Sequence, residues 1–166
     1  MDLIHVAIVE DEPLFVQQLK EYIGRYEKDR GRRIKITTFA DGEDITDDYR
    51  GGYDIILMDI QMRFMDGMTA AEKIRTLDHE VIIMFITNMI QYAVRGYEVD
   101  AMDYVVKPVE YFAFSQKLDK AIGRMKKAVQ TYISVPTEDG LQKLAVSDIY
   151  YIESQGHNAC YRTARG

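Results

Sequence analysis

Several side chains that can carry metal and phosphate chemistry stand where short apolar runs of the chain end. Glu10 and Asp11 follow the first run, Asp59 the third, Thr87 the fourth and Lys107 the fifth. Carboxylates brought close together repel one another unless a cation lies among them. Hard oxygen ligands favour Mg²⁺, and no His or Cys stands beside them to favour zinc. These residue types predict a magnesium site wherever the fold brings them together.

Phosphoryl transfer is the reaction that this set of groups supports. A carboxylate can attack phosphorus and form an aspartyl-phosphate, and Asp59 is the candidate nucleophile. Glu10 and Asp11 would hold the metal. Lys107 would neutralise charge on the phosphoryl oxygens, and Thr87 would donate a hydrogen bond to one of them.

Each of these residues also has an ordinary structural explanation. Acidic residues in loops after strands are commonly solvated or cap a helix, and most lysines lie on the surface. The functional interpretation depends on all of them meeting at one edge, from separate connections of the chain.

The elements that would position these residues alternate between strands and helices. Short runs that are apolar on both faces are typical of parallel strands covered by helices on each side. Such runs occupy Val6–Val9, Ile55–Met58, Val81–Ile86 and Tyr104–Val106, and Ile34–Phe39 is a further β-rich stretch. We therefore predict an α/β fold with a doubly wound, five-stranded parallel sheet. Ligands of such sheets bind beyond the carboxyl ends of the strands, where the polar residues above stand.

Segments whose apolar residues recur at the spacing of a helix lie between the predicted strands. The first helix begins at Pro13, and a short polar helix is expected between the turn at Asp41-Gly42 and about Tyr49. The other helices are predicted from apolar residues that recur on one helix face. These residues are Phe15, Leu19, Tyr22 and Tyr26, then Ala70, Ala71, Ile74 and Leu77, then Ile90, Ala93, Val94 and Tyr97, and finally Phe114, Leu118, Ala121, Ile122 and Met125.

The pattern changes after about residue 130. Strand-like segments joined by turns occupy 131–135, 141–146, 149–153 and 159–162, without a helical pattern between them. The residues 131–166 are too few to close a stable core alone. We predict an α/β domain over residues 1–130 and an incomplete all-β segment, the opening of a second domain, over 131–166.

The composition excludes several classes of protein. With 47% hydrophobic and 29% charged residues, the chain is neither disordered nor fibrous. No apolar run approaches the roughly 18 residues of a membrane span. Cys160 is the one cysteine, and the first residues lack the features of a signal peptide, so we expect a cytoplasmic protein without a membrane partner. The net charge of -6 argues against a surface built wholly for nucleic acid.

The set Glu10-Asp11, Asp59, Thr87 and Lys107-Pro108 resembles the receiver domain of two-component response regulators. The likeness covers roughly residues 4–127 and implies the flavodoxin-like strand order 2-1-3-4-5. It implies that Asp59 accepts a phosphoryl group from a histidine kinase. It also implies a signalling protein that catalyses only its own phosphorylation and dephosphorylation.

The resemblance assigns roles to individual residues. Thr87 and Tyr104 match the family's switch pair, whose hydroxyl and ring move together on phosphorylation. The Lys107-Pro108 peptide would be cis. Glu10 would act on the metal mainly through water. The implied Mg²⁺ ligands are Asp11, Asp59 and the backbone carbonyl of Gln61.

One position departs from the family pattern. Receivers often have proline four positions after the acceptor aspartate, and here Arg63 stands there, before an intact Met65-Asp66-Gly67. Arginine restores a backbone N–H and a flexible φ, so we expect the loop beside Asp59 to be more mobile. Gln61 and Met89 flank the expected phosphoryl site, at positions that would tune attack by water.

The tail carries a second resemblance. Residues 144–153 are similar to the beginning of LytTR-type DNA-binding domains, and residues 96–104 are typical of receivers joined to that domain. His157 and Asn158 lie in the loop that, by this resemblance, approaches DNA, although they are equally typical of an exposed polar turn. Residues 131–166 have a net charge of -1, so this fragment should bind DNA weakly or not at all. Later residues of the complete domain would supply the missing contacts.

The resemblance also implies how a signal would pass to a partner. Many receivers pair through the face formed by the 90–97 stripe, the strand at Tyr104 and the 114–125 helix. We expect phosphorylation to bias the Thr87–Tyr104 pair and so favour a homodimer suited to paired DNA half-sites. The alternative is that these stripes only bury the core of the domain.

Three other functions remain open at this point. A flavin-binding electron carrier would need a phosphate cradle after the first strand, where residues 10–12 are all acidic and would repel phosphate in the absence of a metal. A phosphohydrolase with an aspartyl intermediate usually has a carboxylate two positions after the nucleophile, where Gln61 stands. A bare interaction module would leave Asp59 unmodified.

Overall fold

The structure is a computed structural model that describes residues 3–89, 98–129, 132–137, 140–145, 149–155 and 158–163, with side chains described up to residue 125. The chain divides into two compact units, Met1–Ala121 and Ile122–Gly166. The first unit holds every residue of the predicted magnesium site. The second holds the strands of the tail, and each unit is described by itself.

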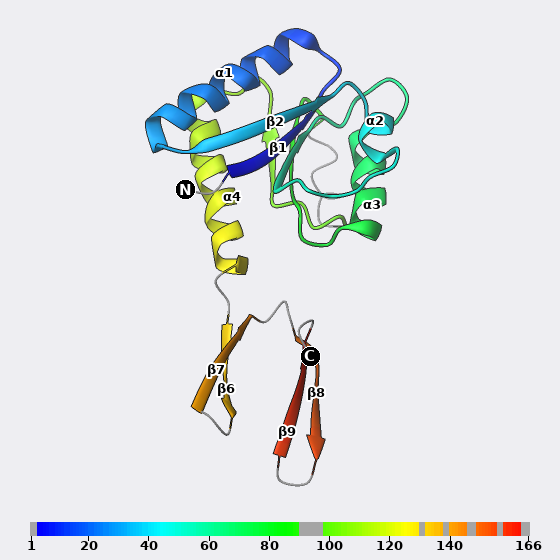
Figure 1. Cartoon of the computed structure of the whole chain (residues 1–166). Coiled ribbons are helices and arrows are strands. Elements are labelled where there is room, and N and C mark those ends of the chain that lie inside the picture. The colour runs from blue at the N-terminus through cyan, green and yellow to red at the C-terminus, as the bar shows by residue number, and fades with distance from the viewer. Residues whose placement is uncertain are drawn as a thin grey trace. The chain divides into compact units, whose positions relative to one another are not determined.

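The first unit is built on a five-stranded parallel sheet with the order β2-β1-β3-β4-β5 (Figure 1). Its strands are β1 (Leu3–Val9), β2 (Arg33–Phe39), β3 (Ile55–Met58), β4 (Ile82–Thr87) and β5 (Asp103–Val106). Every residue of β3 and β4 is buried, which explains why both read as unbroken apolar runs. The predicted fold class and strand order are confirmed.

Helices cover both faces of this sheet. They are α1 (Pro13–Arg30), α2 (Gly42–Thr46), α3 (Gly67–Leu77) and α4 (Tyr111–Val129). In Figure 1, α1 and the beginning of α4 lie on one side of the sheet, and α2 and α3 lie on the other. Pro13 occupies the first turn of α1, where proline is common, and Gly31 ends the helix with a left-handed φ of 61°.

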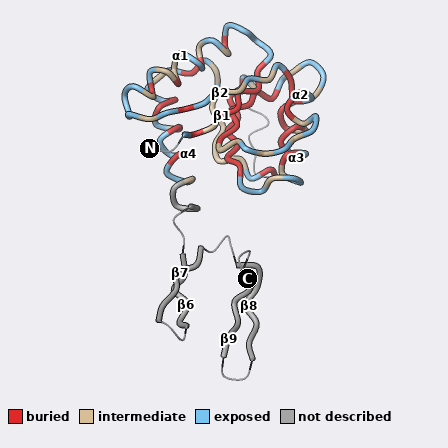
Figure 2. Tube along the Cα trace, viewed as in Figure 1, coloured by how far each residue is buried: buried red, intermediate tan, exposed pale blue. Residues whose placement is uncertain are grey.

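The hydrophobic core follows the strands and the inner faces of the helices, as the red segments of Figure 2 show. On the α2–α3 side, Ile45, Met68 and Ile74 pack with alternate residues of the sheet, including Ala7 and Met58. On the other side, Tyr22 of α1 contacts the rings of Tyr111 and Phe114 at centroid distances of 5.6 and 5.7 Å. The sheet is therefore packed between two layers of helices.

Most of the predicted helix faces are buried, with three differences. Leu77, predicted on the inner face of α3, is 66% exposed because it is the last residue of the helix. In α1 the buried residues are Phe15, Leu19, Ile23 and Tyr26, and Tyr22 is only half-buried. Met125 of α4 is half-buried as well. The predicted 90–97 stripe lies outside the described residues, and so do the side chains beyond residue 125.

The second unit contains two antiparallel hairpins. They are formed by β6 (Tyr132–Thr137) with β7 (Gly140–Ala145), and by β8 (Ile149–Gln155) with β9 (Asn158–Thr163). This agrees with the strands predicted for the tail. His157 and the side chain of Asn158 lie outside the described residues. In the described part of the chain, no helix is both long enough and apolar enough to span a membrane.

Candidate functional site

The polar residues predicted to meet do meet at the carboxyl edge of the sheet. Glu10 and Asp59 directly follow β1 and β3, whose last residues, Val9 and Met58, are register partners. Thr87 ends β4, and Lys107 follows β5 directly; the backbone N–H of Lys107 donates to the Thr87 carbonyl at 3.0 Å. Parallel pairing thus brings together side chains from four separate strand ends.

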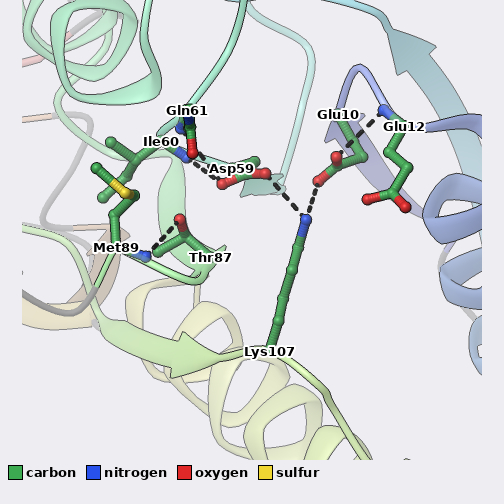
Figure 3. Close-up of polar contacts among 8 residues, drawn as sticks. All are labelled: Glu10, Glu12, Asp59, Ile60, Gln61, Thr87, Met89 and Lys107. Atoms are coloured by element: carbon green, nitrogen blue, oxygen red, sulfur yellow. Dashed lines mark hydrogen bonds and ion pairs between the residues drawn. The ribbon is translucent and has the colours of Figure 1, made fainter.

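Lys107 joins two carboxylates at the centre of the site. Its Nζ lies 2.9 Å from Oε2 of Glu10 and 2.9 Å from Oδ2 of Asp59 (Figure 3). All three side chains are at most 10% exposed. The ammonium also lies 4.1 Å from the centre of the Phe15 ring, a cation–π contact. The lysine is therefore fixed by charge and by packing.

Burial and neighbouring charges shift the pKa values of Glu10 and Lys107. Burial raises the pKa of Glu10 to about 7, and the nearby Asp59 charge adds to the effect, although the hydrogen bond from Lys107 opposes it. Burial alone would lower the pKa of Lys107, but the hydrogen bonds to Asp59 and Glu10 raise it above its usual value. Lys107 therefore stays charged, whereas the carboxyl group of Glu10 titrates near neutral pH.

Three carboxylates could share a cation here. Each of Glu10, Asp11 and Asp59 offers an oxygen, and these oxygens lie within 4.8 Å of one another; Asp11 is exposed and the other two are buried. They open into a cavity of about 340 Å³. An all-oxygen donor set with one solvent-facing member fits Mg²⁺, which usually keeps several waters. The cavity is lined by Glu10, Asp11, Glu12, Asp59, Gln61, Met62, Arg63, Thr87, Asn88 and Lys107.

The backbone around Asp59 fixes its carboxylate. Oδ1 accepts from the N–H of Ile60 at 2.7 Å and more weakly from that of Gln61 at 3.4 Å. The N–H of Gly67 donates to the Ile60 carbonyl at 2.8 Å. A Cβ at Gly67 would collide with the carbonyl oxygen of Asp59, so only glycine permits this close approach. Oδ2 is left pointing to Lys107 (Figure 3).

Thr87 and Tyr104 stand on neighbouring strands. Thr87 is fully buried, and its Oγ1 accepts from the N–H of Met89 at 3.1 Å. Tyr104 pairs in register with Phe85, two residues before Thr87, and the two rings lie 6.3 Å apart. Alternate residues of a strand point to one face, so both switch candidates belong to the same face of the sheet. The Lys107-Pro108 peptide is cis, as expected.

Sequence reasoning missed several members of the site. Glu12, Met62 and Asn88 line the cavity, and the N–H of Glu12 donates to Oε1 of Glu10 at 3.2 Å. Each stands one to three positions from a residue that was predicted, so extending the search along each connection would have found them. The sequence indicates only a turn at Asp41, but its carboxylate accepts hydrogen bonds from the loop after Asp59.

Residues 6–119 match the response regulator receiver domain family. The chain belongs to this family. This agrees with the flavodoxin-like sheet and the acidic edge described above, and the receiver occupies the first compact unit. Receiver domains are signalling proteins, so the earlier expectation of a two-component response regulator is supported for this part of the chain.

Relatives extend the likeness into the tail. Sensory transduction protein LytT of Enterococcus faecalis is 27% identical over 163 residues, covering 90% of this chain and 64% of the relative. Transcriptional regulatory protein YpdB of Escherichia coli K12 is 30% identical over 162 residues, covering 90% of this chain and 65% of the relative. This chain therefore spans less than two thirds of the length of either relative.

Solved structures agree with the receiver fold. The response regulatory domain of mrkE from Klebsiella pneumoniae has a TM-score of 0.67 at 30% identity, covering 75% of this chain and 99% of that one. TrrA from Thermotoga maritima, in complex with Mg²⁺ and beryllofluoride, has a TM-score of 0.61 at 26% identity, covering 71% of this chain and 98% of that one. The two relatives are named as a sensory transduction protein and a transcriptional regulatory protein, and the two solved structures as a response regulatory domain and a response regulator; none of the four is named as a flavin carrier or a phosphohydrolase.

Proposed function

We propose that Asp59 is the phosphoacceptor of this receiver and that a histidine kinase supplies the phosphoryl group. The single observation that carries the proposal is the buried Lys107 ammonium held 2.9 Å from Asp59 Oδ2, with both residues lining a cavity rich in carboxylates. A carboxylate beside a fixed cation is suited to receive a phosphoryl group whose charge that cation then neutralises.

The reaction moves one phosphoryl group between two side chains. A carboxylate oxygen of Asp59 forms a bond to phosphorus, while the bond from phosphorus to the imidazole nitrogen of the donor histidine breaks and leaves its electron pair on that nitrogen. Lys107 then binds a phosphoryl oxygen. The hydroxyl of Thr87, which now accepts from Met89, turns to donate to another.

The proposed metal ligands are Asp11, Asp59 and the backbone carbonyl of Gln61, with Glu10 acting through water. The cluster of carboxylate oxygens supports this assignment, and TrrA, a relative in fold and family, was solved with Mg²⁺ and beryllofluoride. Bound Mg²⁺ would neutralise charge on the transferring group. Glu10, whose pKa is about 7, is charged more fully once a cation offsets its neighbours.

The output of the whole protein is also a proposal, because the chain covers only part of its relatives. We infer that residues 131–166 open a LytTR-type DNA-binding domain, that phosphorylation switches a homodimer, and that the complete protein regulates transcription. The hairpins β6–β7 and β8–β9 and the regulatory relatives LytT and YpdB support this. The lone Cys160 fits a cytoplasmic location.

Intact-mass measurement after incubation with acetyl phosphate and Mg²⁺ tests the acceptor. We expect the wild type to gain one phosphoryl group, about 80 Da, because one activated carboxylate is present. Asp59→Ala should gain nothing. Asp48→Ala, which removes an exposed carboxylate paired with Arg50, should behave as the wild type. A wild type without mass gain, or an equal gain in Asp59→Ala, would overturn the proposal.

A further inference from the structure

Asp41 links the start of α2 to the loop that follows Asp59. Its carboxylate is 5% exposed and accepts three backbone hydrogen bonds. Oδ1 accepts from the N–H groups of Glu43 and Met65, both at 2.9 Å, and Oδ2 accepts from the N–H of Phe64 at 2.9 Å. Only the bond from Glu43 is ordinary helix capping. The other two come from residues 23 and 24 positions further along the chain.

Gly42 makes room for the same contact. A Cβ at this position would lie 2.7 Å from the carbonyl oxygen of Met65 and 3.0 Å from Cβ of Ala70. The loop therefore approaches the backbone of α2 more closely than any other residue at position 42 would allow. Asp41 therefore supplies a hydrogen-bond acceptor for the loop, and Gly42 leaves space for the loop backbone because it has no side chain. These two features independently fit the same loop.

The carboxylate of Asp41 is held in its charged form. Burial alone would raise its pKa, but the hydrogen bonds from the backbone N–H groups of Glu43, Phe64 and Met65 lower the pKa below its usual value. A charged acceptor makes stronger hydrogen bonds than a neutral one. The contact with the loop therefore persists at neutral pH.

The loop held by Asp41 forms one wall of the phosphoacceptor cavity. Gln61, Met62 and Arg63 line that cavity, between Asp59 and the residues that Asp41 binds. The loop is fixed at its first end by the Asp59 N–H, which donates to the Val9 carbonyl at 3.0 Å. Arg63 stands at a common proline position of this loop. The backbone N–H groups of the next two residues, Phe64 and Met65, are bound to the Asp41 side chain.

We propose that Asp41 is a positioning residue for phosphoryl transfer at Asp59: by binding the Phe64 and Met65 N–H groups it holds Gln61 and Met62 at the distance from the acceptor that sets the rates of phosphorylation and hydrolysis. The proposal rests on the proposed function of Asp59. It requires that Asp41 act through the loop, and not only through the helix that it caps.

Two substitutions separate these roles. Asp41→Ser keeps a good helix cap, but the single, shorter hydroxyl cannot also accept the hydrogen bonds from the Phe64 and Met65 N–H groups. Asp41→Asn keeps an oxygen in place of Oδ1 but puts an NH₂ group, which cannot accept, opposite the Phe64 N–H. Asp78→Ser is the matched control, because Asp78 accepts from the N–H groups of Glu80 and Val81 and from the Tyr49 hydroxyl, next to the amino end of β4.

The first measurement is amide hydrogen exchange of the loop in the full chain, which does not depend on phosphorylation. We expect the Phe64 and Met65 N–H groups to exchange faster in Asp41→Ser than in the wild type, with Asp41→Asn between them and Asp78→Ser unchanged. Unchanged exchange in both Asp41 variants would show that the carboxylate does not hold the loop, and would overturn the inference.

The second measurement follows intact mass over time, first with acetyl phosphate and Mg²⁺ and then after the donor is removed. We expect Asp41→Ser to change the phosphorylation rate or the phosphoryl lifetime about fivefold or more, because small displacements of positioning groups cost large factors in rate. Asp41→Asn should change them less, and Asp78→Ser should not change them, even though it loses stability. Wild-type rates in both Asp41 variants would contradict the inference. A wild type that gains no phosphoryl mass refutes the acceptor role of Asp59 instead, and the exchange experiment still reports on the loop.

Discussion

Nζ of Lys107 lies 2.9 Å from Oδ2 of Asp59, although 48 positions separate the two residues in the sequence. The same nitrogen lies 2.9 Å from Glu10, which is 97 positions away. No short motif contains these three residues. They meet because β1, β3 and β5 are parallel and end at the same edge of the sheet.

Removal of the Lys107 charge should suppress phosphorylation. We expect Lys107→Met to be phosphorylated by acetyl phosphate roughly 100-fold more slowly than the wild type, because loss of a single preorganised charge donor typically has an effect of this size. Lys117→Met is the control, since Lys117 pairs with Asp103 at 2.7 Å and does not line the cavity. Wild-type kinetics in Lys107→Met, followed by intact mass, would contradict the assigned role.

Magnesium should stabilise the receiver through Asp11. A ligand that binds only the folded state, at 100 times its dissociation constant, adds about 2.7 kcal/mol to the free energy of unfolding. We expect urea unfolding, followed by the circular dichroism of the helices, to show this Mg²⁺-dependent shift in the wild type and in Asp48→Asn. Asp11→Asn should show a much smaller shift, because it removes an exposed member of the carboxylate cluster. Equal shifts in all three proteins would argue against this metal site.

Thr87 should couple the phosphoryl group to the rest of the domain without accepting it. In Thr87→Ala we expect Asp59 to be phosphorylated, but the change in amide exchange near Tyr104 on phosphorylation to be lost. The reason is that the hydroxyl, which now accepts from Met89 at 3.1 Å, is no longer there to turn to the phosphoryl oxygen. Thr87→Ser keeps the hydroxyl and should keep the response. A full response in Thr87→Ala would rule out this coupling.

Asp119 should make the stability of the receiver depend on pH. Its hydrogen bonds from Arg30, and additionally from the buried Tyr26 hydroxyl at 2.5 Å, lower its pKa. A lowered pKa in the folded state means that the stabilisation is present above the unfolded pKa of about 3.9 and is lost as the pH falls through the folded value.

Two variants test this pH dependence by urea unfolding. Asp119→Ala should lower the free energy of unfolding at pH 7 by about 1 kcal/mol, chiefly because Tyr26 loses its acceptor. Asp119→Asn keeps that acceptor but has no charge to lose, so its stability should fall less steeply than that of the wild type below about pH 4. Parallel pH profiles for Asp119→Asn and the wild type would refute the linkage.

Two glycines should respond in opposite directions to alanine. Gly67→Ala places a Cβ against the carbonyl oxygen of Asp59 and should destabilise the domain by about 3 kcal/mol or more, as overpacking against a fixed backbone does. Gly24 lies within α1 with no atom within 4 Å of its added Cβ. Gly24→Ala should therefore stabilise the domain by up to about 1 kcal/mol through helix propensity. Similar unfolding midpoints for the two variants would contradict this reading of the packing.

The alternation of buried strands and amphipathic helices could be predicted from the sequence because burial leaves a periodic signal in each element. The runs 34–39 and 55–58 lie within or coincide with β2 and β3. The residues Glu10, Asp59, Thr87 and Lys107 could be predicted as one site because the edge at which parallel strands end follows from the fold class. The residue types at the site could therefore be predicted once the ends of the strands had been located in the sequence.

Other features depend on contacts that no local pattern records. The sequence marks Asp41-Gly42 as a turn, and only the packing of α2 beside the 63–66 loop shows that the carboxylate binds Phe64 and Met65. The pKa of Glu10, near 7, likewise follows from burial and from the distances to Asp59 and Lys107. Sequence determined which groups the protein has and at which edge they lie. Tertiary structure decided which atoms touch, because hydrogen bonds and charge interactions depend on distances between residues far apart in the chain.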